Sequence, residues 1–120
     1  MIARNPQDTV GLVGKDYSSL GALVDRAARE HPELRLTPKE HEGMYPGSDH
    51  YPFAQRGVPA LFFFSGEHPD LHAVTDNVDR ADTEQATRIV RLAFRVGLEV
   101  ANTVARPTWD PAARARVVTP

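Results

Sequence analysis

Residues 58–76 read VPALFFFSGEHPDLHAVTD, and this stretch decides both the fold class and the place of the candidate site. Its first seven residues form an apolar run, which is typical of a β-strand buried on both faces. The residues that follow are rich in His and Asp and show neither a strand nor a helix period. In open α/β sheets, ligands bind beyond the carboxyl ends of the strands. The stretch therefore predicts a core strand that presents a polar loop as the candidate site.

Outward from this stretch, apolar patterns with a strand period alternate with patterns that have a helix period. Residues 9–14 predict another buried strand, and residues 34–37 alternate like a strand with one buried face. Residues 49–56 are consistent with one or two helical turns. A long amphipathic helix is predicted over residues 83–104, where Asp82 with Gln85 resembles a capping box. The helix that follows the first strand is indicated by an apolar stripe of Leu20, Leu23, Val24, Ala27 and Ala28.

This order of elements predicts an α/β fold, a partial three-layer sandwich in which helices flank a mixed, mainly parallel sheet. About three strands are expected, fewer than the usual four to six, which suggests that part of the sheet is missing. Residues 1–106 are expected to form this portion of a domain, and residues 107–120 an irregular C-terminal tail.

The composition bounds the function. The chain has 120 residues, of which 41% are hydrophobic and 25% charged, with a net charge of −2. Such a chain lacks the basic surface that nucleic acid requires, and its longest apolar run, residues 58–64, is too short to span a membrane. Residues 1–6 do not resemble a signal peptide. Because there is no cysteine, any metal must be held by His, Asp or Glu.

The loop after the apolar run carries the densest set of candidate ligands. His68 and His72 are four residues apart, with Asp70 between them and Asp76 beyond. Imidazole and carboxylate groups suit zinc, and a metal-bound histidine usually pairs its other nitrogen with a carboxylate or carbonyl. Pro69 argues against a regular helix, so the spacing of four does not guarantee a shared face. From these residues alone, a polar surface loop is the favoured alternative to a metal site.

A second polar cluster is Ser48, Asp49 and His50. It is not a catalytic triad, because the side chains of adjacent residues point apart, whereas triad members meet from separated positions. Ser48 and Asp49 are more typical of a helix N-terminus. His31 and His41 are interpreted as solvated surface residues.

Four stretches together resemble a known family. They are residues 1–5 (MIARN), 48–53 (SDHYPF), 57–60 (GVPA) and 66–72 (GEHPDLH), the last continuing through Asp76. In this order and at this spacing they resemble the C-terminal part of zinc-dependent aminopeptidases of the co-catalytic two-metal exopeptidase family. That family also includes glutamate-carboxypeptidase-like and transferrin-receptor-like domains.

The resemblance implies a centre of two zinc ions that share a bridging carboxylate. Its five ligands run His, Asp, Glu, Asp, His along the chain, and His72 corresponds to the last. The fourth ligand, an Asp, would immediately precede Met1, and the remaining ligands and the general-base Glu would lie further upstream. The chain is therefore expected to keep one zinc ligand of five and to bind zinc weakly at most.

The resemblance also assigns supporting roles. Asp76 would orient His72 or brace its loop. The residues expected beside the metals or in the substrate cleft are His68, Asp70, Asp49 and His50. Leu71 stands where the family often has a Tyr that steadies the tetrahedral intermediate, and Leu cannot donate a hydrogen bond. The candidates to replace that donor are Tyr45, His50 and Tyr51.

The implied function is hydrolysis of a peptide bond at a chain end by metal-activated water, most simply as an aminopeptidase in a secreted or periplasmic parent. The isolated chain is expected to be inactive. Two alternatives stay open: a non-catalytic binding domain that keeps the fold, and a subunit that complements a separate N-terminal chain. The expected protein partner is a second copy or the missing N-terminal half, because the apolar strand is unsuited to a solvated edge.

Overall fold

The computed structural model describes residues 2–5, 8–37 and 40–119. Met1 of the first matched stretch and Pro120 of the predicted tail lie outside these ranges. Among the described helices, none has the length and apolar composition needed to cross a membrane. The elements are β1 (Thr9–Val13), η1 (Lys15–Tyr17), α1 (Leu20–Ala28), β2 (Arg35–Thr37), η2 (Glu42–Gly47), α2 (Tyr51–Gln55), β3 (Phe62–Phe64), η3 (Val78–Arg80), α3 (Thr83–Asn102) and α4 (Pro111–Val117), where η marks a 3-10 helix.

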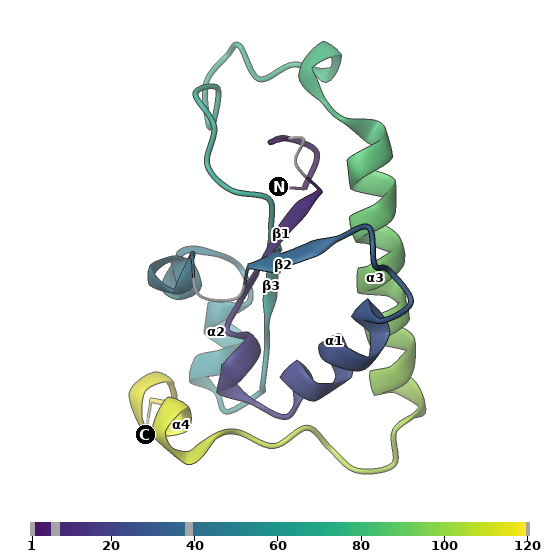
Figure 1. Cartoon of the computed structure of the whole chain (residues 1–120). Coiled ribbons are helices and arrows are strands. Elements are labelled where there is room, and N and C mark those ends of the chain that lie inside the picture. The colour runs from purple at the N-terminus through teal and green to yellow at the C-terminus, as the bar shows by residue number, and fades with distance from the viewer. Residues whose placement is uncertain (1, 6–7, 38–39, 120) are drawn as a thin grey trace.

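The sheet has β1 in the middle, between β2 and β3 (Figure 1). β1 is parallel to β2 and antiparallel to β3, with Leu12 opposite Phe63. The predicted α/β class, with a mixed sheet and flanking helices, is confirmed. The pairing is divided equally rather than mainly parallel, because β3 begins beside the end of β1, where Phe62 faces Val13.

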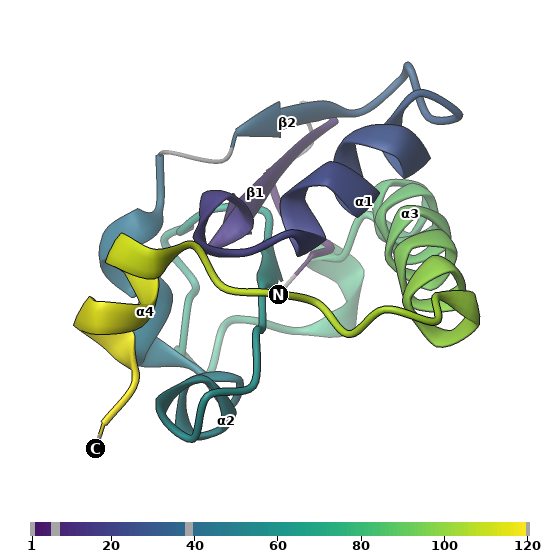
Figure 2. The same ribbon diagram turned by 90° about the horizontal axis from the view of Figure 1, so that it is seen from below.

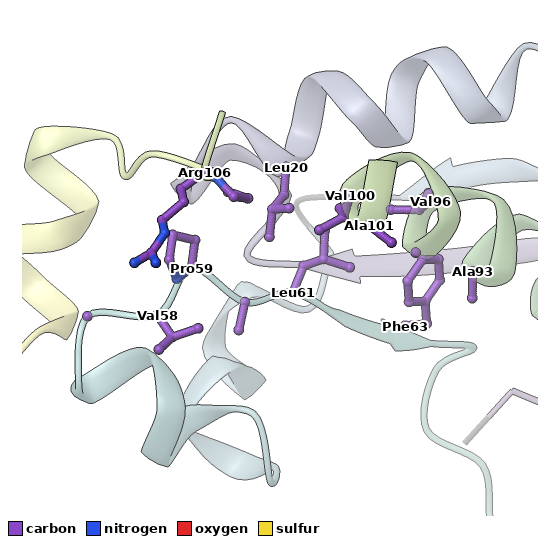
Figure 3. A pocket seen from close by; sticks show the side chains of 14 residues that line it. Leu20, Val58, Pro59, Leu61, Phe63, Ala93, Val96, Val100, Ala101 and Arg106 are labelled. Carbon is purple, nitrogen blue, oxygen red and sulfur yellow. The ribbon is translucent and has the colours of Figure 1, made fainter. Parts of the chain in front are cut away.

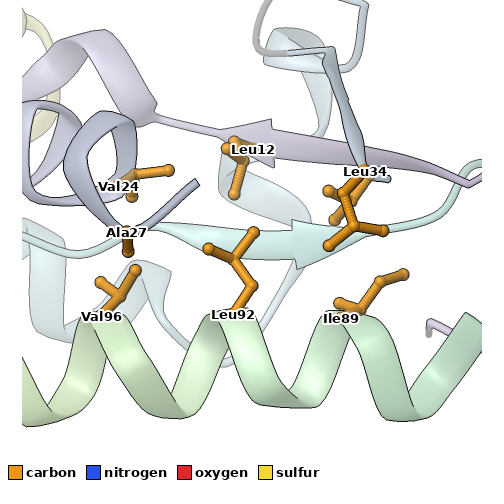
Figure 4. Packing of buried hydrophobic residues seen from close by; sticks show 8 residues of the cluster. Leu12, Val24, Ala27, Leu34, Ile89, Leu92 and Val96 are labelled. Carbon is orange, nitrogen blue, oxygen red and sulfur yellow. The ribbon is translucent and has the colours of Figure 1, made fainter. Parts of the chain in front are cut away.

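Alternate residues of β1 face opposite layers, as the period of a strand requires. Val10 and Leu12 pack with α1 and α3 in one buried cluster (Figure 4). Val13 packs with Tyr45 of η2 and Val117 of α4 in a second cluster. Figure 2 shows α1 and α3 on one side of the sheet and η2, α2 and α4 on the other. The described chain is thus a small three-layer arrangement with a core on each face of the sheet.

The long helix α3 begins where the sequence predicts. The Asp82 side chain accepts a hydrogen bond from the Gln85 backbone N–H at 2.8 Å. The other half of the capping box is not formed, because Gln85 is fully buried and its Nε2 donates to the Asn5 carbonyl at 2.7 Å. The start of α3 is therefore tied to the N-terminal segment, whereas Ile89 and Leu92 further along the helix face the sheet.

Two predicted elements differ from the structure. The strand predicted over residues 58–64 is regular only at Phe62–Phe64, because β1 ends at Val13 and the Pro59 nitrogen cannot donate to a ladder. The loop predicted over residues 38–48 contains η2, with Pro38 outside the described ranges.

The predicted irregular tail contains the helix α4. Asp110 caps it by accepting from the Ala113 N–H at 2.9 Å, and Pro111 occupies the first turn, a combination that starts helices. Ala113 and Val117 are buried, and the Trp109 indole N–H donates to the Gly57 carbonyl at 2.9 Å. The expectation of an irregular tail is therefore wrong for residues 111–117, where a capped helix packs on the second cluster.

Candidate functional site

The loop that leaves β3 lies against the N-terminal segment. The side-chain amide of Asn5 donates to the carbonyls of Ser65 and Glu67, at 3.1 and 2.8 Å. Gly66 has a φ of 96°, and a Cβ there would lie 2.9 Å from the Asn5 amide nitrogen, so the close approach requires glycine. Figure 1 shows the loop as the arc between β3 and α3, with the N-terminal segment beneath it. Two stretches 60 or more residues apart in sequence thus form one unit.

Asp70 is the centre of a charged network in this loop. Its carboxylate accepts from Arg4 at 2.5 Å, from the Thr75 hydroxyl at 2.8 Å and from Arg80 at 3.0 Å. The hydrogen bonds from Arg4 and then from Thr75 hold the pKa of Asp70 down, to about 2. Asp76 binds the same Arg4 guanidinium through its second terminal nitrogen. Asp70 and Asp76 are therefore both bound by arginine.

The two histidines of the loop occupy different environments. His72 is exposed and has a left-handed backbone, with a φ of 59°. His68 is buried, and its Nε2 lies 3.9 Å from an Asp76 carboxylate oxygen, beyond hydrogen-bond distance. Neither ring nitrogen of His68 has a hydrogen-bond partner among the described residues. His68 therefore lies inside the loop and His72 on its outside.

The second polar cluster lies at the other end of β3. The His50 ring stacks on Phe62 with centroids 5.5 Å apart and meets Tyr45 edge-on at 4.7 Å, and Tyr51 also packs edge-on against Tyr45 at 6.0 Å. Asp49 is exposed. Figure 1 shows α2, which His50 immediately precedes, and the His72 loop at opposite ends of β3. The two matched motifs are therefore not brought together by the described part of the chain.

The polar groups of this second cluster are held by packing. The Tyr45 hydroxyl donates to the Ala60 carbonyl at 3.2 Å, and burial raises the pKa of Tyr45 to about 12. Burial lowers the pKa of His50, and its two ring nitrogens find no partner in the ranges described. The candidate roles of Tyr45, His50 and Tyr51 in stabilising an intermediate stay predictions.

His41 lies closer to the loop than sequence reasoning expects. Its ring packs edge-on against Phe64 at 5.1 Å, and a Cβ on Gly11 would come within 2.6 Å of its Cδ2. It borders a cavity of about 340 Å³, together with Asn5 and Gly66. The sequence signal that could have indicated this position of His41 is Gly11, because a glycine inside a strand often marks the close approach of another group.

The described residues do not form a metal centre by themselves. Over residues 2–5, 8–37 and 40–119, no group of three or more His, Asp or Glu side chains is arranged to hold a metal ion. Asp70 and Asp76 already bind Arg4, so these carboxylates are not placed as ligands around His72. The residues present therefore do not fit the two-zinc centre by themselves, and the expected last ligand, His72, is exposed on this loop.

The fold and the loop define an α/β domain with its candidate site beyond the end of a sheet strand. A model of peptidase family M28 matches residues 1–97. This chain belongs to peptidase family M28, which makes it a metallopeptidase homologue and, by family, a hydrolase. No curated protein and no solved structure matches the chain.

Proposed function

We propose that this chain is the C-terminal portion of a zinc-dependent exopeptidase, most simply an aminopeptidase, and that His72 is one of its metal ligands. The observation that carries the proposal is the union of the N-terminal segment with the loop of His72 through Arg4 and Asn5. Both stretches belong to the family match. A secreted or periplasmic location for the parent rests on the resemblance alone.

The shortage of ligands supports the view that other polypeptide completes the site. Zinc normally takes three or four protein ligands, and the described residues offer no such group. When bound, zinc would polarise the carbonyl of a peptide substrate and lower the pKa of water. In that reaction, this chain would contribute His72 as a ligand, presented on a loop that Arg4 and Asn5 hold in place. The remaining ligands and the general base are proposed to lie on polypeptide outside these 120 residues.

A surface beside the loop suits that polypeptide. Within the described ranges, β3 pairs with β1 on one side and with no strand on the other. Next to it an apolar cavity of about 660 Å³ lies between Leu61, Phe63 and the α3 residues Ala93, Val96 and Val100 (Figure 3). An unpaired strand edge accepts another strand, and a strand added to β3 would pass the point where the His72 loop begins. We infer that the ligand-bearing polypeptide covers this surface, and that a second copy covers it when that polypeptide is absent.

The test is the peptidase activity of the chain joined to the polypeptide encoded directly before Met1. We expect zinc-dependent hydrolysis of aminoacyl anilides that His72→Ala abolishes and that His31→Ala, a matched change at a histidine bound to Glu33, leaves intact. The isolated chain is expected to show no zinc-dependent rate, since a missing general base alone typically costs about 10²–10⁴-fold. A rate that does not depend on His72, or a gene that encodes no such polypeptide, contradicts the proposal and favours the binding-domain alternative.

A further inference from the structure

Both ends of the His72 loop are held by one guanidinium. Arg4 Nη2 binds Asp70, two residues before His72, and Arg4 Nη1 binds Asp76, four residues after it. The Arg4 side chain is only 14% exposed and that of Asp70 only 10%. Two nitrogens of a planar fork thus engage two separate carboxylates. This geometry is specific to arginine, because the ammonium group of lysine is a compact point charge without a fork.

Between the two carboxylates that Arg4 binds, residues 70–76 form a hydrogen-bonded loop. The Ala73 N–H donates to the Asp70 carbonyl at 2.8 Å, and the Asp76 N–H donates to the Ala73 carbonyl at 3.1 Å. The Thr75 hydroxyl adds a bond to the Asp70 carboxylate at 2.8 Å. His72 has its left-handed backbone within this closed loop. Such a conformation is unfavourable for a residue with a side chain and persists when the surroundings impose it.

The backbone on both sides of Arg4 is itself bound to the start of α3. On one side of Arg4, the Ala3 carbonyl accepts from the Asp82 N–H at 2.7 Å, at the start of α3. On the other side, the Asn5 carbonyl accepts from the buried Gln85 side chain at 2.7 Å. Arg4 is therefore held to the first turn of the longest helix. A loop that is bound to Arg4 is therefore connected through α3 to the core.

We propose that Arg4 is a positioning residue that fixes the direction in which His72 is presented, by holding Asp70 and Asp76 on one guanidinium. The relevance of this to metal binding rests on the proposed function, in which His72 is a ligand. The network also explains why the two carboxylates are not free to act as ligands: they serve to hold the loop. Arg80 contacts Asp70 alone and cannot replace the two-ended grip.

The test is the order of the loop in Arg4→Met and Arg4→Lys, measured by NMR relaxation and by the Cα and Cβ shifts of His72. In the wild-type chain, residues 71–75 should have order parameters near the roughly 0.85 of a rigid backbone, and His72 should show left-handed shifts. In both variants we expect the order parameters to fall below about 0.6 and the left-handed signature to be averaged. Lysine should fail to rescue the loop, since it keeps the charge and loses the fork.

Arg88→Met is the matched control, because Arg88 binds Asp8 outside the loop and its loss changes the net charge equally. It should leave residues 71–75 unchanged. Hydrogen exchange at Ile89 and Leu92 in α3 reports on the fold. An unchanged loop in the Arg4 variants overturns the inference, and so does an equal loss of protection in loop and helix, which would make Arg4 a general stabiliser.

This outcome is separable from that of the proposed function. If the Arg4 variants loosen the loop but His72→Ala leaves the activity of the joined protein intact, then Arg4 does position the loop, but His72 is not the metal ligand. If His72→Ala abolishes activity while the loop stays ordered without Arg4, the ligand assignment stands and the grip is overturned.

Discussion

The two ends of β3 carry similar residues and use them differently. At its start, His50 and Tyr45 are packed among aromatic rings, and their polar atoms are buried. At its end, Asp70 and Asp76 are held by arginine, and His72 is exposed. Both ends match the same family, so motif residues alone do not distinguish packing from a site. What distinguishes them is whether the polar groups are surrounded by rings or by charges.

The comparison predicts its largest effect at the start of β3. Tyr45 is 2% exposed, so Tyr45→Ala should destabilise the chain by about 3–5 kcal/mol, the usual cost of deleting a buried ring. His72→Ala, at the other end, should change stability by less than about 0.5 kcal/mol, because that side chain is exposed. The measurement is urea unfolding followed by circular dichroism.

Tyr45→Phe keeps the chain foldable and separates the ring from its hydroxyl. It should cost about 1 kcal/mol, the usual net value of the hydrogen bond to the Ala60 carbonyl. Equal stabilities of the Tyr45→Ala and His72→Ala proteins would remove the distinction between a packed end and an exposed end.

Sequence reasoning found most elements of this fold because each of those has a local signal. The apolar run at Phe62–Phe64 and the capping pair at the start of α3 can both be recognised within a few residues. The helix α4 had such a signal too, in Asp110 and Pro111, which the reading of an irregular tail overlooked.

The site was less legible because its contacts are long-range. The polar loop is plain in the sequence, but nothing near Arg4 indicates that its partners lie 66 and 72 residues away. Gln85 similarly satisfies the local capping rule in the sequence, yet its side chain serves Asn5. Likewise, the burial of His50 and the position of His41 depend on which rings the sheet brings beside them.

The middle of β3, between these two ends, allows a further prediction with a smaller expected effect, on self-association of the chain. If its free edge and the adjoining cavity are uncovered in the isolated chain, that chain should self-associate at micromolar concentration, most simply as a two-fold dimer. Gly97→Arg should weaken this association at least about tenfold, because a cavity-lining charge must be desolvated in the interface. A Cβ added at Gly97 meets nothing within 4 Å, and arginine favours a helix more than glycine does, so the fold should tolerate the change.

Gly43→Arg is the matched control for this change, because a Cβ at Gly43 also meets nothing within 4 Å and Gly43 does not line the cavity. It should associate like the wild-type chain. Light scattering over a concentration series measures the self-association of the wild-type chain and of both variants. A 13.3 kDa monomer at every concentration, with cooperative unfolding, would show that the surface needs no cover.

The smallest expected effect is a pH dependence between pH 5 and 7 that the start of β3 should confer. Burial between Phe62 and Tyr45 lowers the pKa of His50 from 6.5, partly opposed by the nearby Asp49 charge. Below pH 6.5 the unfolded chain therefore binds a proton at His50 that the folded chain does not, and folding stability should fall as pH decreases from about 7 to 5. One histidine can contribute at most about 1.4 kcal/mol per pH unit. His50→Phe, which keeps an aromatic ring against Phe62, should flatten this part of the profile. Urea midpoints of the wild-type and His50→Phe proteins between pH 5 and 8 give the comparison. A His50→Phe profile as steep as that of the wild-type chain would show that the packed histidine at the start of β3 does not confer the pH dependence.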